Sequence, residues 1–81
     1  MSPLQIQYSD HAVVEMRKAK ITRQVVRLVL AHGVKAFDGR RGHEDYWTST
    51  LQIENQSYQV SWVQKAGYIL VVTAYRLGEY D

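Results

Sequence analysis

The chain has 81 residues, a net charge of +2 and no cysteine. A chain of this length forms one domain, so we interpret residues 1–81 as a single domain. The lack of cysteine excludes a disulfide scaffold and thiolate metal sites. No apolar run approaches the roughly 18 residues of a transmembrane helix. The first residues have neither the basic start nor the apolar centre of a signal peptide, so we expect a cytoplasmic protein.

The basic residues are concentrated in the first half of the chain. Residues 1–41 contain eight Lys or Arg against three Asp or Glu, a net charge of +5. Residues 42–81 contain two Lys or Arg against five Asp or Glu, a net charge of −3. A positive surface of this kind attracts phosphate-bearing partners. Two solvated helix faces would produce the same distribution, and charge alone does not separate these interpretations.

A short edge strand and a helix are predicted at the start of the chain. Apolar and polar residues alternate in "LQIQY", residues 4–8, as in a strand at the edge of a sheet. Ser9 or Asp10 can cap a helix that continues to about Ala19. His11 then lies in the first turn, at the border between the apolar face and a polar stripe.

A second helix is predicted after "KIT". Thr22 is its expected cap, and Gly33 is expected to end it in the left-handed conformation. His32, in the last turn, is interpreted as a cap-region residue because helix C-termini favour cations. The residues expected to be buried are Val25, Val26, Leu28, Val29 and Leu30.

The remainder of the chain is predicted to form a sheet. "VKAF" is a short strand that ends at the turn signal Asp38-Gly39, and "YWTSTLQIE" and "SYQVSWVQ" show the alternation of half-buried strands. "YILVVTAY" is apolar on both faces, as in a central strand. The turns are too short for crossovers, so we expect antiparallel hairpins. The prediction is an α+β domain, with two N-terminal helices packed on a mainly antiparallel four-stranded sheet and residues 4–8 as an extra edge strand.

The sequence predicts neither a metal site nor a cofactor. The three histidines are widely separated, and the run "HED" at residues 43–45 is interpreted as a solvated loop. "DGRRG" lacks the Lys-Ser/Thr pattern of a phosphate-binding loop.

Metal-free cleavage of RNA is compatible with the residues that the chain contains. RNA carries its own nucleophile, the 2′-hydroxyl, so the protein must move protons and stabilise charge on phosphorus. Histidine suits the proton steps because its ordinary pKa lies near neutrality. Basic and hydroxyl side chains suit the charge step. Thr73 and Tyr75 are two residues apart on the last predicted strand, so their hydroxyls share a face. Both could equally be strand formers that only pack at the sheet edge.

Four segments taken in order, "YSDHA", "EMRKAKIT", "VVRLVLAHG" and "YILVVTAYR", resemble the domain-of-unknown-function family 4258. The resemblance covers nearly the whole chain. That family is similar in predicted fold to the RelE-type toxins and to the barnase, EndoU and colicin ribonuclease group. The resemblance implies a metal-independent endoribonuclease, often a toxin whose partner is an antitoxin or an immunity protein. It further implies that His11 is the catalytic acid and base and that Thr73 and Tyr75 belong to the site.

The chain departs from the family pattern at two places. Glu15 stands where the family has an arginine before Met16, and Ala19-Lys20 stands where it has Arg-Gly. Glu15 would repel phosphate and, if paired with His11, would raise the pKa of the imidazole. The residues expected to supply phosphate-binding charge are Arg17, Lys18, Lys20 and Arg41.

Three interpretations of the function therefore stay open. The first is the endoribonuclease, with RNA as substrate. The second is a non-catalytic protein- or RNA-binding module that keeps the fold. The third is a homodimer formed through an exposed edge strand or through Trp47 and Trp62.

Overall fold

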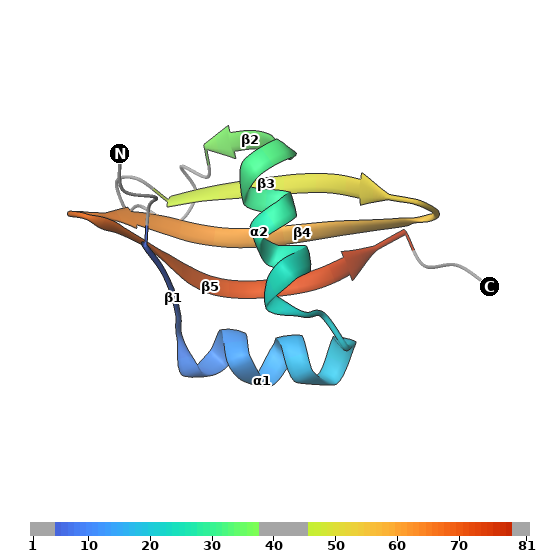
Figure 1. Cartoon of the computed structure of the whole chain (residues 1–81), viewed down its shortest axis with the longest axis horizontal. Helices are drawn as coiled ribbons and strands as arrows, with labels where there is room; N and C mark the ends of the chain where they lie inside the picture. The colour runs from blue at the N-terminus through green and yellow to red at the C-terminus, as the bar shows by residue number, and fades with distance from the viewer. Residues whose placement is uncertain (1–4, 38–45, 79–81) are drawn as a thin grey trace.

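The computed structural model describes residues 5–37 and 46–78. These residues form two helices and five strands (Figure 1). The elements are β1 (Gln5–Tyr8), α1 (Asp10–Ala19), α2 (Arg23–His32), β2 (Val34–Phe37), β3 (Tyr46–Ile53), β4 (Gln56–Lys65) and β5 (Tyr68–Leu77). The predicted α+β class is confirmed.

The strands form one sheet in the order β1-β5-β4-β3-β2. Neighbouring strands are antiparallel except β1, which runs parallel to β5 with Tyr8 opposite Val71. The predicted extra edge strand is therefore present as β1, and it brings the sheet of the described residues to five strands. The described strands thus form the mainly antiparallel sheet that was predicted. β1 is parallel to β5 because the intervening helices and strands let it lie beside the last strand without a tight turn.

The cap of α1 also ties the helix to the sheet. The Ala12 N–H donates a hydrogen bond to Ser9 Oγ at 3.0 Å, and the Ser9 hydroxyl donates to the Val72 carbonyl at 3.0 Å. The helix ends at Ala19, as predicted, and Lys20 follows in the left-handed conformation with φ 58°. This turn directs the chain into α2.

Thr22 caps α2 as predicted, since its hydroxyl accepts a hydrogen bond from the Val25 N–H at 3.2 Å. Gly33 follows the helix with φ −73°, so the prediction of a left-handed glycine is wrong. A close approach explains the glycine instead. A Cβ atom at this position would lie 2.5 Å from the Val29 carbonyl oxygen and 2.9 Å from the Thr50 carbonyl oxygen.

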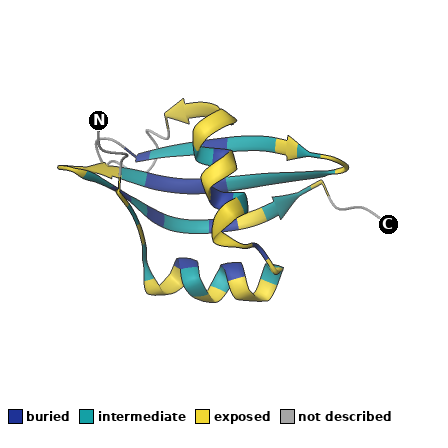
Figure 2. Cartoon of the chain, viewed as in Figure 1, coloured by how far each residue is buried: buried dark blue, intermediate teal, exposed yellow. Residues whose placement is uncertain are grey.

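The core lies between the helices and one face of the sheet. In Figure 1, α2 crosses the face of the sheet and α1 lies beside β5, and in Figure 2 the buried parts of the strands lie beneath α2 and to the left of it. Val26 and Val29 of α2 are fully buried, but Leu28 is 38% exposed, which corrects the prediction that it is buried. Leu28 precedes Val29 by one position and is turned about 100° away from it. The buried cluster contains Ala12, Met16, Ile21, Val26, Val29, Val60, Trp62, Ile69, Val71 and Ala74.

The side chains of β3 and β4 alternate between the two faces of the sheet as predicted, but Tyr46 and Ser61, on the face without helices, are buried as well. Trp47 pairs with Trp62 and Ser49 pairs with Val60, on the face that the helices cover. The Trp62 indole N–H donates a hydrogen bond to Ser49 Oγ at 2.8 Å inside the core. Successive side chains in a strand point to opposite faces, so Ser61 lies on the face without helices.

Candidate functional site

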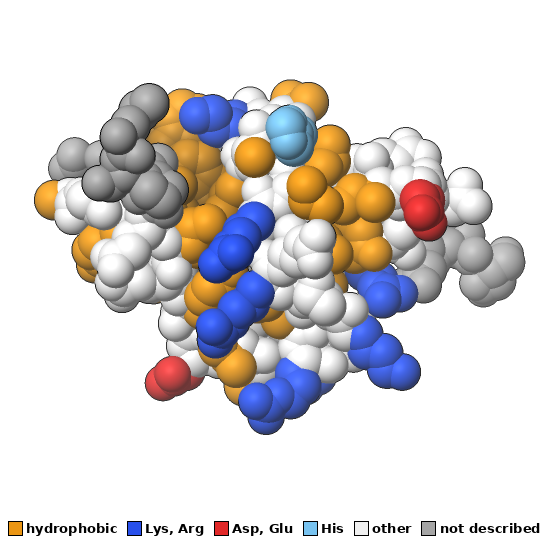
Figure 3. Space-filling view, in the orientation of Figure 1, with side chains coloured by type: hydrophobic (Ala, Val, Ile, Leu, Met, Phe, Trp, Pro, Cys, Tyr) orange, Lys and Arg blue, Asp and Glu red, His pale blue; other side chains and the backbone are white. Residues whose placement is uncertain are grey.

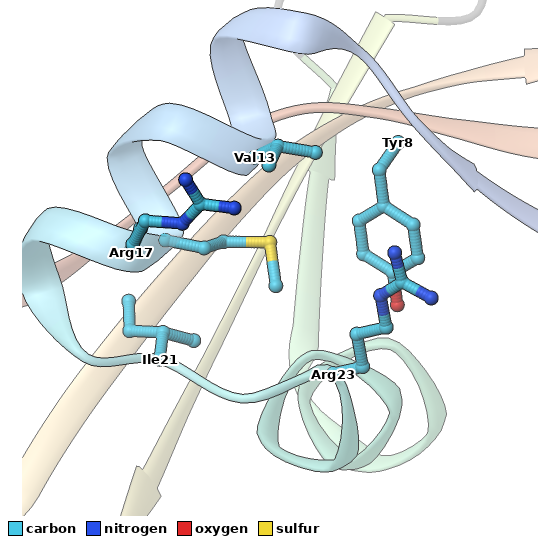
Figure 4. A pocket seen from close by; sticks show the side chains of 6 residues that line it. Tyr8, Val13, Arg17, Ile21 and Arg23 are labelled. Atoms are coloured by element: carbon cyan, nitrogen blue, oxygen red, sulfur yellow. The ribbon is translucent and has the colours of Figure 1, made fainter.

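A pocket of about 230 Å³ lies between β1, α1 and the start of α2 (Figure 4). We call it the α1–α2 pocket. Its lining residues are Tyr8, Val13, Met16, Arg17, Ile21 and Arg23. They come from the end of β1, one flank of α1, the turn between the helices and the first turn of α2. The pocket therefore depends on the two helix caps and on the left-handed turn at Lys20, which set the angle between these elements.

Tyr8 forms part of the wall and contacts a basic side chain. The Arg23 guanidinium carbon lies 5.0 Å from the centre of the Tyr8 ring, a cation–π contact that Figure 4 shows at the side of the pocket. Burial raises the pKa of the Tyr8 phenol above its ordinary value of 10.0, and the charges of Arg23 and Arg27 offset part of that rise. The phenol is therefore protonated at neutral pH and can donate a hydrogen bond to a ligand.

Two guanidinium groups from different helices reach the pocket. Arg17 extends from α1 and Arg23 from α2 (Figure 4), while Val13, Met16 and Ile21 supply apolar surface between them. Arginine binds phosphate and carboxylate oxygens in a planar, two-pronged geometry. The α1–α2 pocket thus combines anion-binding groups with an apolar floor.

The described residues carry a net positive charge. Residues 5–37 and 46–78 together contain eight Lys or Arg against three Asp or Glu. Figure 3, which views the helices from the front, shows Lys and Arg side chains over α2 and along α1, with hydrophobic surface between them. A polyanion would meet this helix-bearing face with favourable long-range attraction.

An aromatic patch formed by Phe37, Trp47 and Trp62 lies on the same face of the sheet. The two indoles stack with centres 6.0 Å apart and planes 16° apart, and Phe37 meets Trp47 edge-on at 5.4 Å. Lys35 Nζ lies 5.8 Å and 5.7 Å from the two indole centres. Phe37 is 56% exposed whereas Trp62 is buried, so the patch reaches the surface at β2 through Phe37. This pairing of aromatic rings with a cation is also found where proteins stack nucleobases.

His11 does not line the α1–α2 pocket. It is exposed on α1, and helical periodicity places it on the flank opposite Val13 and Arg17, across the buried ridge of Ala12 and Met16.

Thr73 and Tyr75 share a face of β5, as the sequence predicts. They pair with Ser61 and Gln59 of β4, on the face of the sheet without helices. Of the predicted site residues described by the structure, Arg17 lies at the pocket, while His11, Thr73 and Tyr75 do not.

The other predicted phosphate ligands lie apart from the pocket. Lys18 is exposed and its Nζ lies 3.7 Å from a Glu15 carboxylate oxygen. Lys20 is exposed in the turn after α1. Arg41 lies outside the described residues, as do the Asp38-Gly39 turn and the run of residues 43–45. Within the described ranges, no three His, Asp or Glu side chains form a group that could hold a metal ion. The described helices also include none that is long and apolar enough to cross a membrane.

Sequence reasoning missed Tyr8 and Arg23 as site residues. Tyr8 is one position of the alternating strand pattern of residues 4–8, and Arg23 is a polar position in a helical run, so neither pattern marks a site. Their contact depends on the turn between the helices, which folds the start of α2 back onto the end of β1. The available signal was weak: an aromatic residue directly before a helix cap, and an arginine directly after the next one.

Comparisons with protein-family models, with curated proteins and with solved structures found no match to this chain.

Proposed function

We propose that this domain binds RNA through the helix-bearing face around the α1–α2 pocket. The observation that carries the proposal is the position of Arg17 and Arg23, which come from two helices and flank one pocket with an apolar floor beside Tyr8. RNA presents phosphates and bases in alternation, so it matches a surface on which cations and apolar groups alternate. On the same face, the exposed Phe37 and the half-buried Trp47 add ring surface suited to bases.

The salt dependence of RNA binding tests this proposal. If Arg17, Arg23 and Arg27 each contact a phosphate, the logarithm of the affinity for single-stranded RNA should fall with the logarithm of salt concentration with a slope of about −2. Arg23→Gln should make the slope shallower by about 0.7. Lys65→Gln, at the exposed end of β4, is the matched control and should leave the slope unchanged. A flat slope for the wild type, or equal effects of the two substitutions, would contradict the proposal.

Metal-independent cleavage of the bound RNA is a second candidate function. The observation in its favour is that His11 is exposed in the first turn of α1, while the Glu15 carboxylate lies 3.7 Å from Lys18 Nζ. Glu15 lies one helical turn after His11, and its carboxylate is paired with Lys18. This pairing offsets the repulsion that Glu15 would exert on a phosphate beside His11. In this reaction the neutral imidazole takes the proton from the 2′-hydroxyl, and the 2′-oxygen attacks phosphorus. The bond from phosphorus to the 5′-oxygen breaks, and the imidazolium returns the proton to that oxygen, leaving a cyclic phosphate.

Cleavage is tested with the purified chain in EDTA. The expected result is strand scission that His11→Ala abolishes and that His32→Ala, an exposed histidine at the end of α2, does not change. Equal scission by the wild type and His11→Ala would remove His11 from the mechanism. Salt-dependent RNA binding without scission would instead identify a non-catalytic RNA-binding module.

A further inference from the structure

We propose that the α1–α2 pocket holds one unstacked nucleotide of single-stranded RNA, with its base on the apolar floor and its phosphate between Arg17 and Arg23. This inference rests on the proposed RNA binding and adds the substrate class and the residues that recognise it.

The size and the apolar floor of the pocket favour a single base. Its volume of about 230 Å³ is below the roughly 300–1,000 Å³ of sites for drug-sized ligands. Met16 and Ile21 are buried members of the core, so the floor is fixed, and the half-buried Val13 forms the wall on α1. A planar ring system would remove this apolar surface from water.

The polar groups at the pocket suit the phosphate of the same nucleotide. Arg17 and Arg23 offer guanidinium donors, and Tyr8 keeps its hydroxyl proton at neutral pH. A carboxylate of an acidic peptide would satisfy the arginines but would leave the floor of Val13, Met16 and Ile21 uncovered. A nucleotide uses both kinds of surface.

The same geometry selects against duplex RNA. In a double helix the bases are stacked and paired, and the bases that proteins hold in pockets are those splayed from loops or single strands. The cavity lies between two helices, so the base must leave its own stack to enter it.

The test uses a methyl group of the pocket as its probe. The chain has two methionines, Met1 and Met16, and Met16 lines the pocket. With carbon-13-labelled methionine methyl groups, a titration with uridine 5′-monophosphate or a short oligouridylate should shift the Met16 signal. A loop-free RNA duplex of equal charge, and polyglutamate of equal charge, should shift it far less.

Two matched pairs of variants locate the binding. Val13→Trp fills the pocket without changing charge and should weaken oligouridylate binding about tenfold. Val14→Trp, one residue along the same helix and 48% exposed, should have little effect. Arg17→Gln should weaken binding more than Lys18→Gln, and this second pair keeps the test valid if Val13→Trp fails to fold.

The outcomes separate the pocket from general RNA binding. If oligouridylate binds with a steep salt dependence but Met16 does not shift, and both members of each pair behave alike, the pocket inference is overturned while RNA binding stands. If the loop-free duplex or polyglutamate shifts Met16 as strongly as oligouridylate does, the nucleotide specificity is wrong. If no RNA binds at low salt, both the proposed function and this inference fail.

Discussion

The hydrogen bond between Trp62 and Ser49 provides a quantitative test of how the core is held together. Trp62 is 4% exposed and Ser49 is fully buried, and the indole N–H donates to the serine hydroxyl at 2.8 Å. Ser49→Ala removes the acceptor and leaves the indole N–H without this partner inside the core. Loss of one partner of a buried hydrogen bond costs about 1–3 kcal/mol.

This cost is large for a domain of 81 residues. Typical stabilities are about 0.05–0.15 kcal/mol per residue. For a domain of this size, each kcal/mol lowers the melting temperature by roughly 4–8 °C. We therefore expect Ser49→Ala to be folded but clearly less stable than the wild type. Urea denaturation followed by circular dichroism measures the change without relying on the altered tryptophan environment.

A double-mutant cycle isolates the hydrogen bond. In a Trp62→Phe background there is no indole N–H to leave unpaired, so Ser49→Ala should cost much less there than in the wild type. If Ser49→Ala changes the unfolding free energy by less than about 0.5 kcal/mol, or costs the same in both backgrounds, the hydrogen bond does not contribute as argued.

Three further predictions concern the backbone and the pocket. Gly33→Ala should lower the unfolding free energy by about 1–3 kcal/mol, because its Cβ would overlap two backbone carbonyl oxygens that side-chain motion cannot move. An unfolding free energy equal to that of the wild type in urea denaturation would disprove this. Thr22→Ala should lower the unfolding free energy by about 1 kcal/mol. Ser9→Ala should lower it further, because the Ser9 hydroxyl both caps α1 and donates a hydrogen bond to β5. Equal melting temperatures of the two variants would contradict this prediction. The raised pKa of Tyr8 favours the neutral phenol in the folded state, so its contribution is complete below pH 10.0 and is lost as pH rises through the folded-state pKa. The unfolding free energy of Tyr8→Phe should therefore fall less steeply than that of the wild type above pH 10.0, as measured by urea titrations at several pH values.

Local signals predicted the local structure well. Ser9 and Thr22 cap the two helices because each places a hydroxyl oxygen before a helical run, and this needs only neighbouring residues. The alternation of Trp47, Ser49 and Leu51 also predicted the buried face of β3, since side chains in a strand alternate. In these segments the sequence pattern and the tertiary environment agree.

The remaining features depend on contacts between distant residues. Gly33 is extended because the chain passes close to β3 at Thr50, and no signal near Gly33 reports that approach. The parallel pairing of β1 with β5 joins the two ends of the described chain. The candidate site has the same origin, because Tyr8 meets Arg23 only after the turn between α1 and α2 has set their separation.

The pairing of β1 with β5 has a consequence for biosynthesis. Tyr8 leaves the ribosome early, but the strand that holds it in place is the last of the five, and Ser9 hydrogen-bonds to Val71 and Val72. Contacts between such distant segments form slowly because a long loop must close first. The α1–α2 pocket can therefore assemble only after β5 has been synthesised. A nascent chain lacks the completed site, so any activity of the pocket begins after β5 has emerged from the ribosome.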